Sequence, residues 1–172
     1  AVGALAIAAA WTYTGSDNPY GYAGWGEVSV FVFFGPVAVL GTMLTQAGAV
    51  TWWAGVASAG VGLYAVALLM VNNIRDLETD AQAGKRTLAV RVGPFRARQL
   101  FAGAVMAPVL LAVVVAFELP LALLATVVAL PSLFIAIGMR LSGPAADLRA
   151  FFGGISAVGL AYGLLLALGI VL

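Results

Sequence analysis

Residues 49–80 read AVTWWAGVASAGVGLYAVALLMV-NNIRDLETD, and the change in character at position 72 decides how this part of the chain folds. The first part, 49–71, has no charged residue over a length that can cross the roughly 30 Å hydrocarbon core of a bilayer as an α-helix. The second part, 72–80, holds two adjacent asparagines and four charged residues. We therefore expect a membrane-spanning helix that ends in a polar segment at the membrane surface.

Uncharged stretches of similar length recur on both sides of this one. They cover 28–45, 99–117, 119–139 and 150–172, and residues 1–11 form a shorter apolar stretch that reads as a partial helix. The chain is 63% apolar and only 9% charged, whereas a soluble domain has roughly 25% charged residues. These stretches are apolar on every side and do not alternate, which favours helices over the strands of a membrane β-barrel. The expected fold is an all-α, polytopic transmembrane helix bundle with five full spans and one partial span.

The basic residues indicate how these spans are oriented. Counting crossings from the partial helix places all eight on one side of the membrane: Arg75, Lys85, Arg86, Arg91, Arg96, Arg98, Arg140 and Arg149. Short loops rich in Lys and Arg mark the cytoplasmic side. We therefore expect an integral protein of the cell membrane whose charged loops face the cytoplasm.

Small residues predict where the helices pack closely. Two stripes repeat at a spacing of four: Ala54, Ser58 and Gly62 in one span, and Gly153, Ala157 and Ala161 in the last. Such stripes let helix backbones approach one another inside a membrane. Both stripes are therefore expected at helix contacts.

The chemistry is concentrated between Arg75 and Arg98, which enclose nine of the fifteen charged residues. The chain has no His and no Cys, so any metal must be held by oxygen. At about 100° per residue, Asn72, Asp76 and Asp80 share one helix face. Glu78 points the other way, and we expect it to pair with Arg75.

Asp76 and Asp80 have the chemistry of a magnesium site. Two carboxylates one helical turn apart repel each other unless a cation lies between them, and Mg²⁺ is commonly held by one or two carboxylates together with phosphate oxygens. Lys85 and Arg86 follow closely and can contact a polyanion. A metal–diphosphate site at the membrane surface is one interpretation. A solvated loop that is basic only because it faces the cytoplasm explains the charges equally well.

A longer string points to a family. NNIRDxxxDxxxGKRTLAVRxG, over 72–93, closely resembles the second aspartate-rich motif of the UbiA superfamily of membrane prenyltransferases. Its ending is similar to the menaquinone branch, the 1,4-dihydroxy-2-naphthoate polyprenyltransferases. The stretch YTGxxxPYGYAGxGE, over 13–27, is similar to the connection between the fourth and fifth helices of that branch.

This resemblance implies a reaction and a set of partners. Two aspartate-rich motifs in a nine-helix bundle hold two Mg²⁺ on a polyprenyl diphosphate, and the prenyl group passes to an aromatic ring, here dihydroxynaphthoate, in menaquinone biosynthesis. The resemblance assigns roles to eight residues: Asp76 and Asp80 as catalytic metal ligands, Asn72 and Asn73 as polar partners of the substrate, Lys85 or Arg86 as diphosphate contacts, and Tyr20 and Tyr22 at the border of the cavity. The two tyrosines also fit an interfacial aromatic belt. Membrane lipid is an expected partner and nucleic acid is not.

The first aspartate-rich motif is not found in 1–172. We therefore expect these residues to be the C-terminal part of a single UbiA-like domain, catalytically incomplete without an N-terminal part of the same protein. The main alternative is a non-enzymatic membrane subunit or a transporter with a charged cytoplasmic loop. Transporters place ionisable groups near the bilayer midplane, whereas here they lie near span ends, which favours the enzyme. A CDP-alcohol phosphotransferase is less favoured, because its D-x-x-D-G-x-x-A-R signature is missing.

Overall fold

The computed structural model describes residues 2–16, 19–143 and 147–172, and its regular elements are all helical. In chain order these elements are α1 (Val2–Thr14), η1 (Tyr20–Ala23), α2 (Gly26–Val32), η2 (Phe33–Val37), α3 (Ala38–Ala47), α4 (Trp52–Arg75), α5 (Leu77–Gln82), α6 (Leu88–Ala116), η3 (Pro120–Val128), α7 (Ala129–Leu141) and α8 (Arg149–Val171). The all-α fold expected from the sequence is confirmed.

Within the residues that the structure describes, five helical segments are long and apolar enough to cross a membrane. They are Gly26–Ala47, Trp52–Arg75, Leu88–Ala116, Pro120–Leu141 and Arg149–Val171. The first joins α2 and α3 through a π-helical turn, and the fourth joins a 3₁₀ segment to α7. The number of full spans agrees with the sequence analysis, and α1 is the shorter helix expected before them. The protein is an integral membrane protein.

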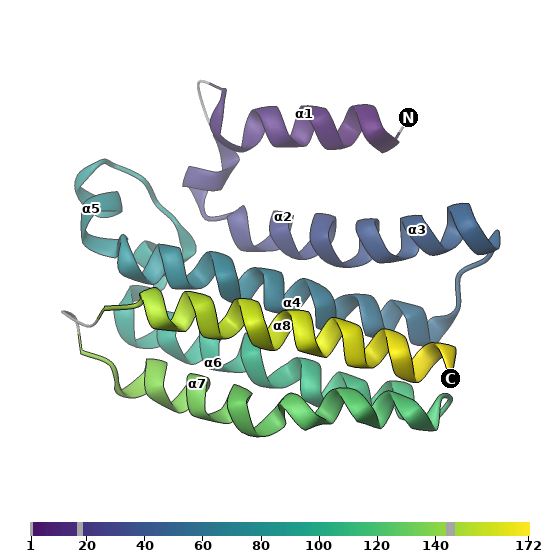
Figure 1. Ribbon diagram of the computed structural model, residues 1–172. Helices are drawn as coiled ribbons and strands as arrows, with labels where there is room; N and C mark the ends of the chain where they lie inside the picture. The colour runs from purple at the N-terminus through teal and green to yellow at the C-terminus, as the bar shows by residue number, and fades with distance from the viewer. Residues whose placement is uncertain (1, 17–18, 144–146) are drawn as a thin grey trace.

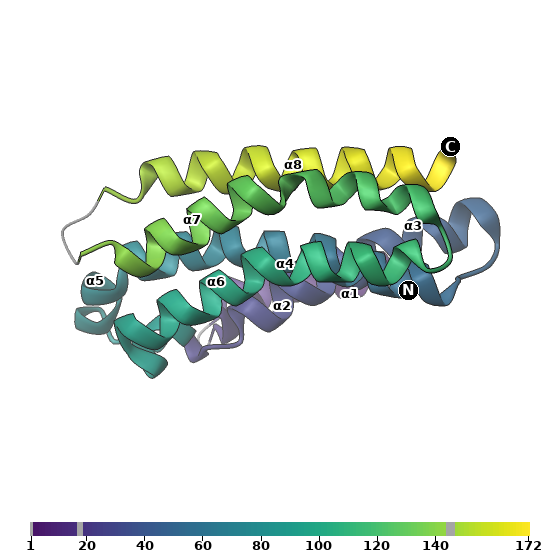
Figure 2. The same ribbon diagram turned by 90° about the horizontal axis from the view of Figure 1, so that it is seen from below.

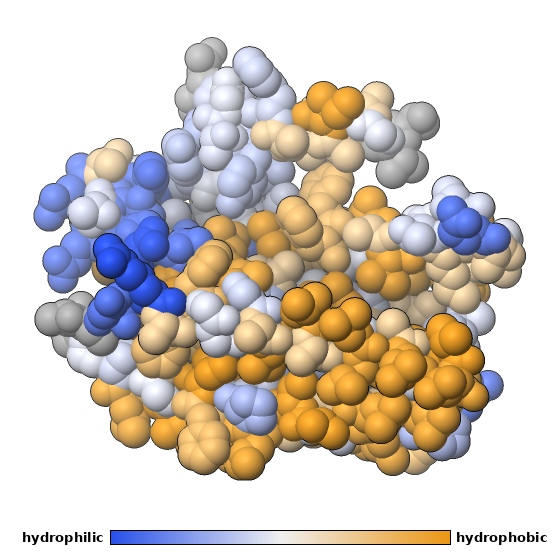
Figure 3. Space-filling view, viewed as in Figure 1, coloured by the Kyte–Doolittle hydropathy of each residue, from blue (hydrophilic) through white to orange (hydrophobic). Residues whose placement is uncertain are grey.

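Four of the long segments form the packed part of the bundle, in which α4, α6, α7 and α8 run side by side (Figures 1 and 2). Segment α2–α3 lies along α4, and α1 lies beyond it, joined through η1 (Figure 1). The largest buried side chains include Phe101 of α6, Met70 of α4 and Tyr162 of α8. Hydrophobic side chains cover most of the face in Figure 3, while hydrophilic ones gather at the end that carries α5. One end of the bundle therefore holds the polar chemistry.

The stripe of small residues on α4 packs as expected. Ala54 and Ser58 are buried, and the Gly62 Cα lies so close to the π-helical turn that a Cβ there would be 2.9 Å from the Phe31 carbonyl oxygen. Gly35, inside that turn, makes the matching approach: its own Cβ would lie 2.7 Å from the Ser58 carbonyl oxygen. The two backbones therefore meet where neither residue has a side chain.

The stripe expected on the last span is not the packing face of α8. Gly153 and Ala157 are exposed, and of the three only Ala161 packs partly against the core. The buried face of α8 carries four larger residues and one glycine, namely Ile155, Val158, Tyr162, Leu166 and Gly169. Close approach occurs at Gly169, where an added Cβ would collide with the backbone of η3. The physical reason is that α8 packs against η3 and α4 through bulky side chains, so the small-residue face is left outward.

The segment that links two spans at the charged end of the bundle, 72–98, is mostly helical. α4 ends at Arg75, the short α5 follows, and α6 already begins at Leu88. A break inside α6 falls at Gly93, whose φ of 82° is in the left-handed region that glycine tolerates. The basic residues of this segment therefore lie at the end of α4, in the turn 83–87 and in the first part of α6.

Candidate active site

Two segments far apart in the sequence meet at the polar end of the bundle. The Arg86 N–H donates to the Tyr22 carbonyl oxygen over 2.7 Å, and the Arg91 guanidinium donates to the Ala23 carbonyl oxygen over 3.1 Å. Gly24 makes this approach possible, because its φ is 84° and a Cβ there would lie 2.8 Å from Cδ of Arg91. The connection before α2 is thus fastened to the turn that follows α5.

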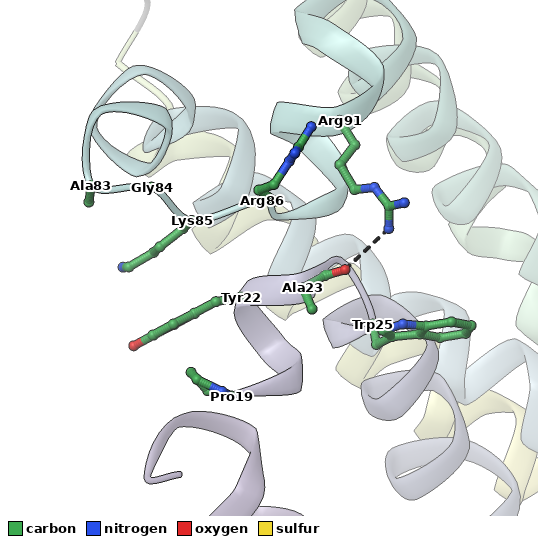
Figure 4. A pocket seen from close by; sticks show the side chains of 9 residues that line it. All are labelled: Pro19, Tyr22, Ala23, Trp25, Ala83, Gly84, Lys85, Arg86 and Arg91. Atoms are coloured by element: carbon green, nitrogen blue, oxygen red, sulfur yellow. Dashed lines mark hydrogen bonds between the residues drawn. The ribbon is translucent and has the colours of Figure 1, made fainter. Parts of the chain in front are cut away.

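A cavity of about 690 Å³ lies at this junction (Figure 4). Its lining residues are Pro19, Tyr22, Ala23, Trp25, Ala83, Gly84, Lys85, Arg86 and Arg91. We call it the cationic cavity, because three of these side chains are positively charged and none is acidic. The Lys85 ammonium lies 4.7 Å from the centre of the Tyr22 ring, a cation–π contact. This set of side chains suits an anionic ligand with an apolar part.

Asp76 and Asp80 lie on the segment that leads into this cavity. The Asp76 N–H donates to the Asn72 carbonyl oxygen over 2.9 Å, and the Asp80 N–H donates to the Asp76 carbonyl oxygen over 2.8 Å. These successive bonds keep the three residues one turn apart, although the backbone leaves α-helical geometry at Asp76. The backbone spacing expected for the stripe is therefore kept through the break between α4 and α5.

Each aspartate has a basic partner. Arg75 contacts Asp76 through two hydrogen bonds of 2.7 and 2.8 Å, and Lys85 contacts Asp80 Oδ1 over 3.1 Å. The expected pair between Arg75 and Glu78 is wrong, because the helix breaks at Asp76 and the adjacent carboxylate reaches Arg75 first. The hydrogen bond from Arg75 lowers the pKa of Asp76, and the charge of Lys85 lowers it further. The hydrogen bond to Asp80 in turn raises the pKa of Lys85.

The donor set of this segment fits Mg²⁺. Two ionised carboxylates one turn apart provide hard oxygen ligands, and Mg²⁺ usually completes its shell with water and substrate phosphate. Among the described residues no group of three or more His, Cys, Asp or Glu side chains could hold a metal. A metal held by Asp76 and Asp80 would therefore need further ligands, such as water and phosphate oxygens.

The two asparagines point to different neighbours. Asn72 lines a small hollow with Arg75 of α4 and Arg149 of α8. Asn73 donates through Nδ2 to Oε1 of Glu27 over 2.8 Å. Glu27 is only 6% exposed and was not identified by the sequence analysis. An ionisable residue at the very start of an apolar span was the signal that could have found it.

The two tyrosines of η1 also have different neighbours. Tyr22 lines the cationic cavity. The Tyr20 hydroxyl instead hydrogen-bonds the Ala9 carbonyl oxygen and the Ser29 hydroxyl, both at 2.9 Å, and its ring packs edge-on against Tyr13. Tyr20 thereby lines a second, largely apolar cavity of about 530 Å³ between α1 and α2. Arg91, which the sequence analysis counted only as a basic residue, contributes to the cationic cavity in its place.

The fold and the site define the class of this protein: it is a membrane-spanning helix bundle that brings two aspartates and three basic side chains together at one end. The comparison with known families identifies the family to which the chain belongs. The model of the UbiA prenyltransferase family matches residues 1–157, so the chain belongs to this family.

Individual relatives agree with this assignment. The chain is 56% identical over 103 residues to the 1,4-dihydroxy-2-naphthoate octaprenyltransferase of Mycobacterium tuberculosis, covering 60% of this chain and 35% of that protein. It is 44% identical over 101 residues to the protein of that name in Escherichia coli, covering 59% and 33%. UbiA prenyltransferase domain-containing protein 1 of Mus musculus is 27% identical over 128 residues, covering 74% and 38%. The match thus spans about a third of the length of these relatives. No solved structure matches the chain significantly.

Proposed function

We propose that the protein transfers a polyprenyl group from a polyprenyl diphosphate to 1,4-dihydroxy-2-naphthoate, an aromatic acceptor, in menaquinone biosynthesis. The family supports a prenyltransferase, and the names of relatives that are 44–56% identical support this acceptor. In this reaction the bond between the allylic carbon and the diphosphate oxygen breaks, and diphosphate leaves. A ring carbon forms the new carbon–carbon bond, and the ring loses its carboxylate as carbon dioxide, which restores its aromaticity.

One observation carries the proposal: the cationic cavity adjoins the segment of Asp76 and Asp80. Lys85 belongs to both, because it lines the cavity and also pairs with Asp80. A diphosphate in the cavity would meet Lys85, Arg86 and Arg91, whose donors form charge-assisted hydrogen bonds to phosphate oxygens. The same diphosphate would lie close to the two carboxylates, and a cation is needed between those like charges.

Asp76 and Asp80 would hold Mg²⁺, which supplies charge neutralisation of the departing diphosphate when bound. Arg75 keeps Asp76 ionised, because its hydrogen bonds favour the carboxylate form. Lys85 forms a direct ion pair with Asp80, and its ammonium lies 3.1 Å from Asp80 Oδ1. The ring of Tyr22, beside Lys85, offers an aromatic face to a cationic prenyl group, an interaction worth roughly 0.5–2 kcal/mol.

The position of the site at the membrane surface suits the two parts of the substrate. A polyprenyl chain is apolar and partitions into the bilayer, while its diphosphate stays at the surface, which is where the cationic cavity lies. The concentration of Lys and Arg at this end of the bundle supports a cytoplasmic orientation, because short basic loops remain in the cytoplasm. The proposed site therefore faces the cytoplasm at the level of the headgroups of the cell membrane.

A transfer assay tests the proposal. Full-length protein is purified in detergent and supplied with a polyprenyl diphosphate, dihydroxynaphthoate and Mg²⁺, and the prenylated product is followed by mass spectrometry. The expected result is product that disappears when a chelator is in excess. Turnover unaffected by the chelator would exclude the metal role, and no product with any aromatic acceptor would exclude the transferase.

A further inference from the structure

Glu27 is a buried acid that the proposed reaction does not use. It is 6% exposed at the start of α2, Oε1 accepts the hydrogen bond from Asn73, and Oε2 has no hydrogen-bond partner among the described residues. A buried carboxylate with one unsatisfied oxygen costs free energy of folding compared with an apolar residue. We therefore explain this residue by the role of its hydrogen bond to Asn73, and not by a contribution to stability.

That contact reaches the segment of the two aspartates. Asn73 lies three residues before Asp76, in the last turn of α4. Two other hydrogen bonds, Arg86 to Tyr22 and Arg91 to Ala23, fasten the same connection to the residues after α5. Glu27 thus binds just before the two aspartates, and the connection before α2 binds the residues just after them. The segment is therefore held at both ends.

We propose that Glu27 is a positioning residue: by binding Asn73 it fixes the last turn of α4, and so sets where Asp76 lies relative to the cationic cavity. The inference rests on the proposed function, because it assigns Glu27 to the metal and diphosphate site. A charge-assisted hydrogen bond suits this role, since it is about twice as strong as a neutral one and is directional. Misplacing a functional group by about 1 Å can cost roughly 100-fold in rate.

A direct role for Glu27 in the chemistry is disfavoured by its surroundings. It is almost fully buried and is not among the residues that line the cationic cavity. If Glu27 acted on the substrate, every substitution that removes its charge would lower the activity of the enzyme. If Glu27 only positions the segment, activity falls only when the hydrogen bond to Asn73 is lost. These two outcomes can be distinguished by measurement.

An exchange of the two side-chain types separates these roles. Glu27→Gln combined with Asn73→Asp keeps the size, the hydrogen bond and the net charge, but moves the carboxylate from α2 to α4. Asn73→Asp alone places two carboxylates face to face, and we expect it to lower the transfer rate about 100-fold. The double variant should recover to within about tenfold of the unmodified protein, because the bond between positions 27 and 73 is restored. Failure to recover in a folded double variant would overturn the proposal.

The kinetic form of the loss is a second criterion. Glu27→Leu removes the bond without leaving a buried charge, and Glu118→Gln, an exposed acid at the opposite end of the bundle, is the matched control. We expect Glu27→Leu to raise the Mg²⁺ concentration needed for half-maximal rate about tenfold or more, with an unchanged KM for the aromatic acceptor. A change in the acceptor KM alone would assign Glu27 to acceptor binding instead.

Hydrogen exchange tests the same idea without turnover. In metal-free protein, Glu27→Leu should speed exchange of the amides of residues 72–80, while the rest of α4 keeps its protection. Unchanged exchange in that segment would overturn the proposal even if activity fell. An unmodified protein that transferred no prenyl group would instead refute the proposed function, and the exchange result would still decide whether Glu27 positions the segment.

Discussion

The two aspartates of the site are held differently. The Asp76–Arg75 pair is about half exposed, with side-chain exposures of 40% and 51%, whereas the Asp80 side chain is only 12% exposed beside Lys85. An exposed ion pair contributes only about 0–1 kcal/mol, so Arg75 can give up Asp76 to a metal at little cost. Asp80 is the more buried of the two, and its partner Lys85 lines the cationic cavity. In the proposed metal site, we therefore expect Asp80 to keep its position and Asp76 to adjust when a metal binds.

Neutralising either aspartate should abolish most of the activity. We expect Asp76→Asn and Asp80→Asn each to lower the transfer rate by roughly 100-fold or more, because several kcal/mol of charge neutralisation is lost and each 1.36 kcal/mol is tenfold. The control is Glu78→Gln, which removes an exposed acid of the same segment. Product formation at saturating substrates measures the effect. An equal loss in all three variants would contradict a directed metal site.

The cationic cavity makes a prediction about substrate affinity. Arg91→Gln removes a guanidinium that both lines the cavity and holds the Ala23 carbonyl oxygen. A charge-assisted hydrogen bond contributes about 1.5–3 kcal/mol, so the KM for polyprenyl diphosphate should rise roughly 10- to 100-fold. Arg96→Gln, an exposed arginine that does not line the cavity, serves as the control and should leave this KM within about twofold. Similar KM values in the two variants would place the diphosphate elsewhere.

At the scale of the helices, the crossing of α4 with the π-helical turn joins the outer segment α2–α3 to the rest of the bundle. Gly62→Val puts a side chain where a Cβ already meets the Phe31 carbonyl oxygen and the Gly35 Cα at 2.9 and 3.1 Å. Overpacking of this kind costs about 1–3 kcal/mol, so thermal unfolding in detergent should occur at a lower temperature. Gly55→Val, on the same helix but with no atom within 4 Å of the added Cβ, is the control. Equal unfolding temperatures would mean that the crossing does not hold the segment.

The spans themselves follow from the sequence, because an uncharged stretch of about 20 residues has few stable alternatives to a helix in a membrane. The sequence predicts less reliably which face of a span is buried. The prediction for the stripe of Ala54, Ser58 and Gly62 is confirmed, because Ala54 and Ser58 are buried and Gly62 lies at the close contact with Gly35. On α8, small residues occur around the whole helix, so the stripe of Gly153 and Ala157 could not be told from the buried face.

The candidate site was likewise only partly predictable from the sequence. The spacing of Asp76 and Asp80 and the basic turn after them are local, so the sequence predicted the segment on which they lie. The bonds from Arg91 to Ala23 and from Asn73 to Glu27 join residues 68 and 46 positions apart. Such pairs depend on how the helices pack, and no periodicity within one segment indicates them. The local stripe also misled at Glu78, because the helix break at Asp76 changed its partner.

At the scale of the whole molecule, charge is distributed along the bundle axis. α4 ends, α6 begins, α7 ends and α8 begins at the end where all eight Lys and Arg residues lie. At the opposite end, the turns between α3 and α4 and between α6 and η3 hold one charged residue, Glu118. Short-loop asymmetry of this strength sets orientation during insertion. In the proposed orientation, the basic residues that line the site would also keep it on the cytoplasmic side.

Cysteine labelling checks this orientation, and the absence of native cysteine makes the assay clean. Ala83→Cys and Asp147→Cys lie at the basic end, whereas Gln46→Cys and Glu118→Cys lie at the other, and all four positions are exposed. A membrane-impermeant thiol reagent should label the first pair only in inside-out vesicles and the second pair only in intact cells, because an odd number of spans separates them. Labelling of positions 83 and 147 from opposite sides would mean that one of the spans between them does not cross the membrane. Labelling of all four on the faces opposite to those expected would keep the fold but reverse the protein, which would place the diphosphate site outside the cell.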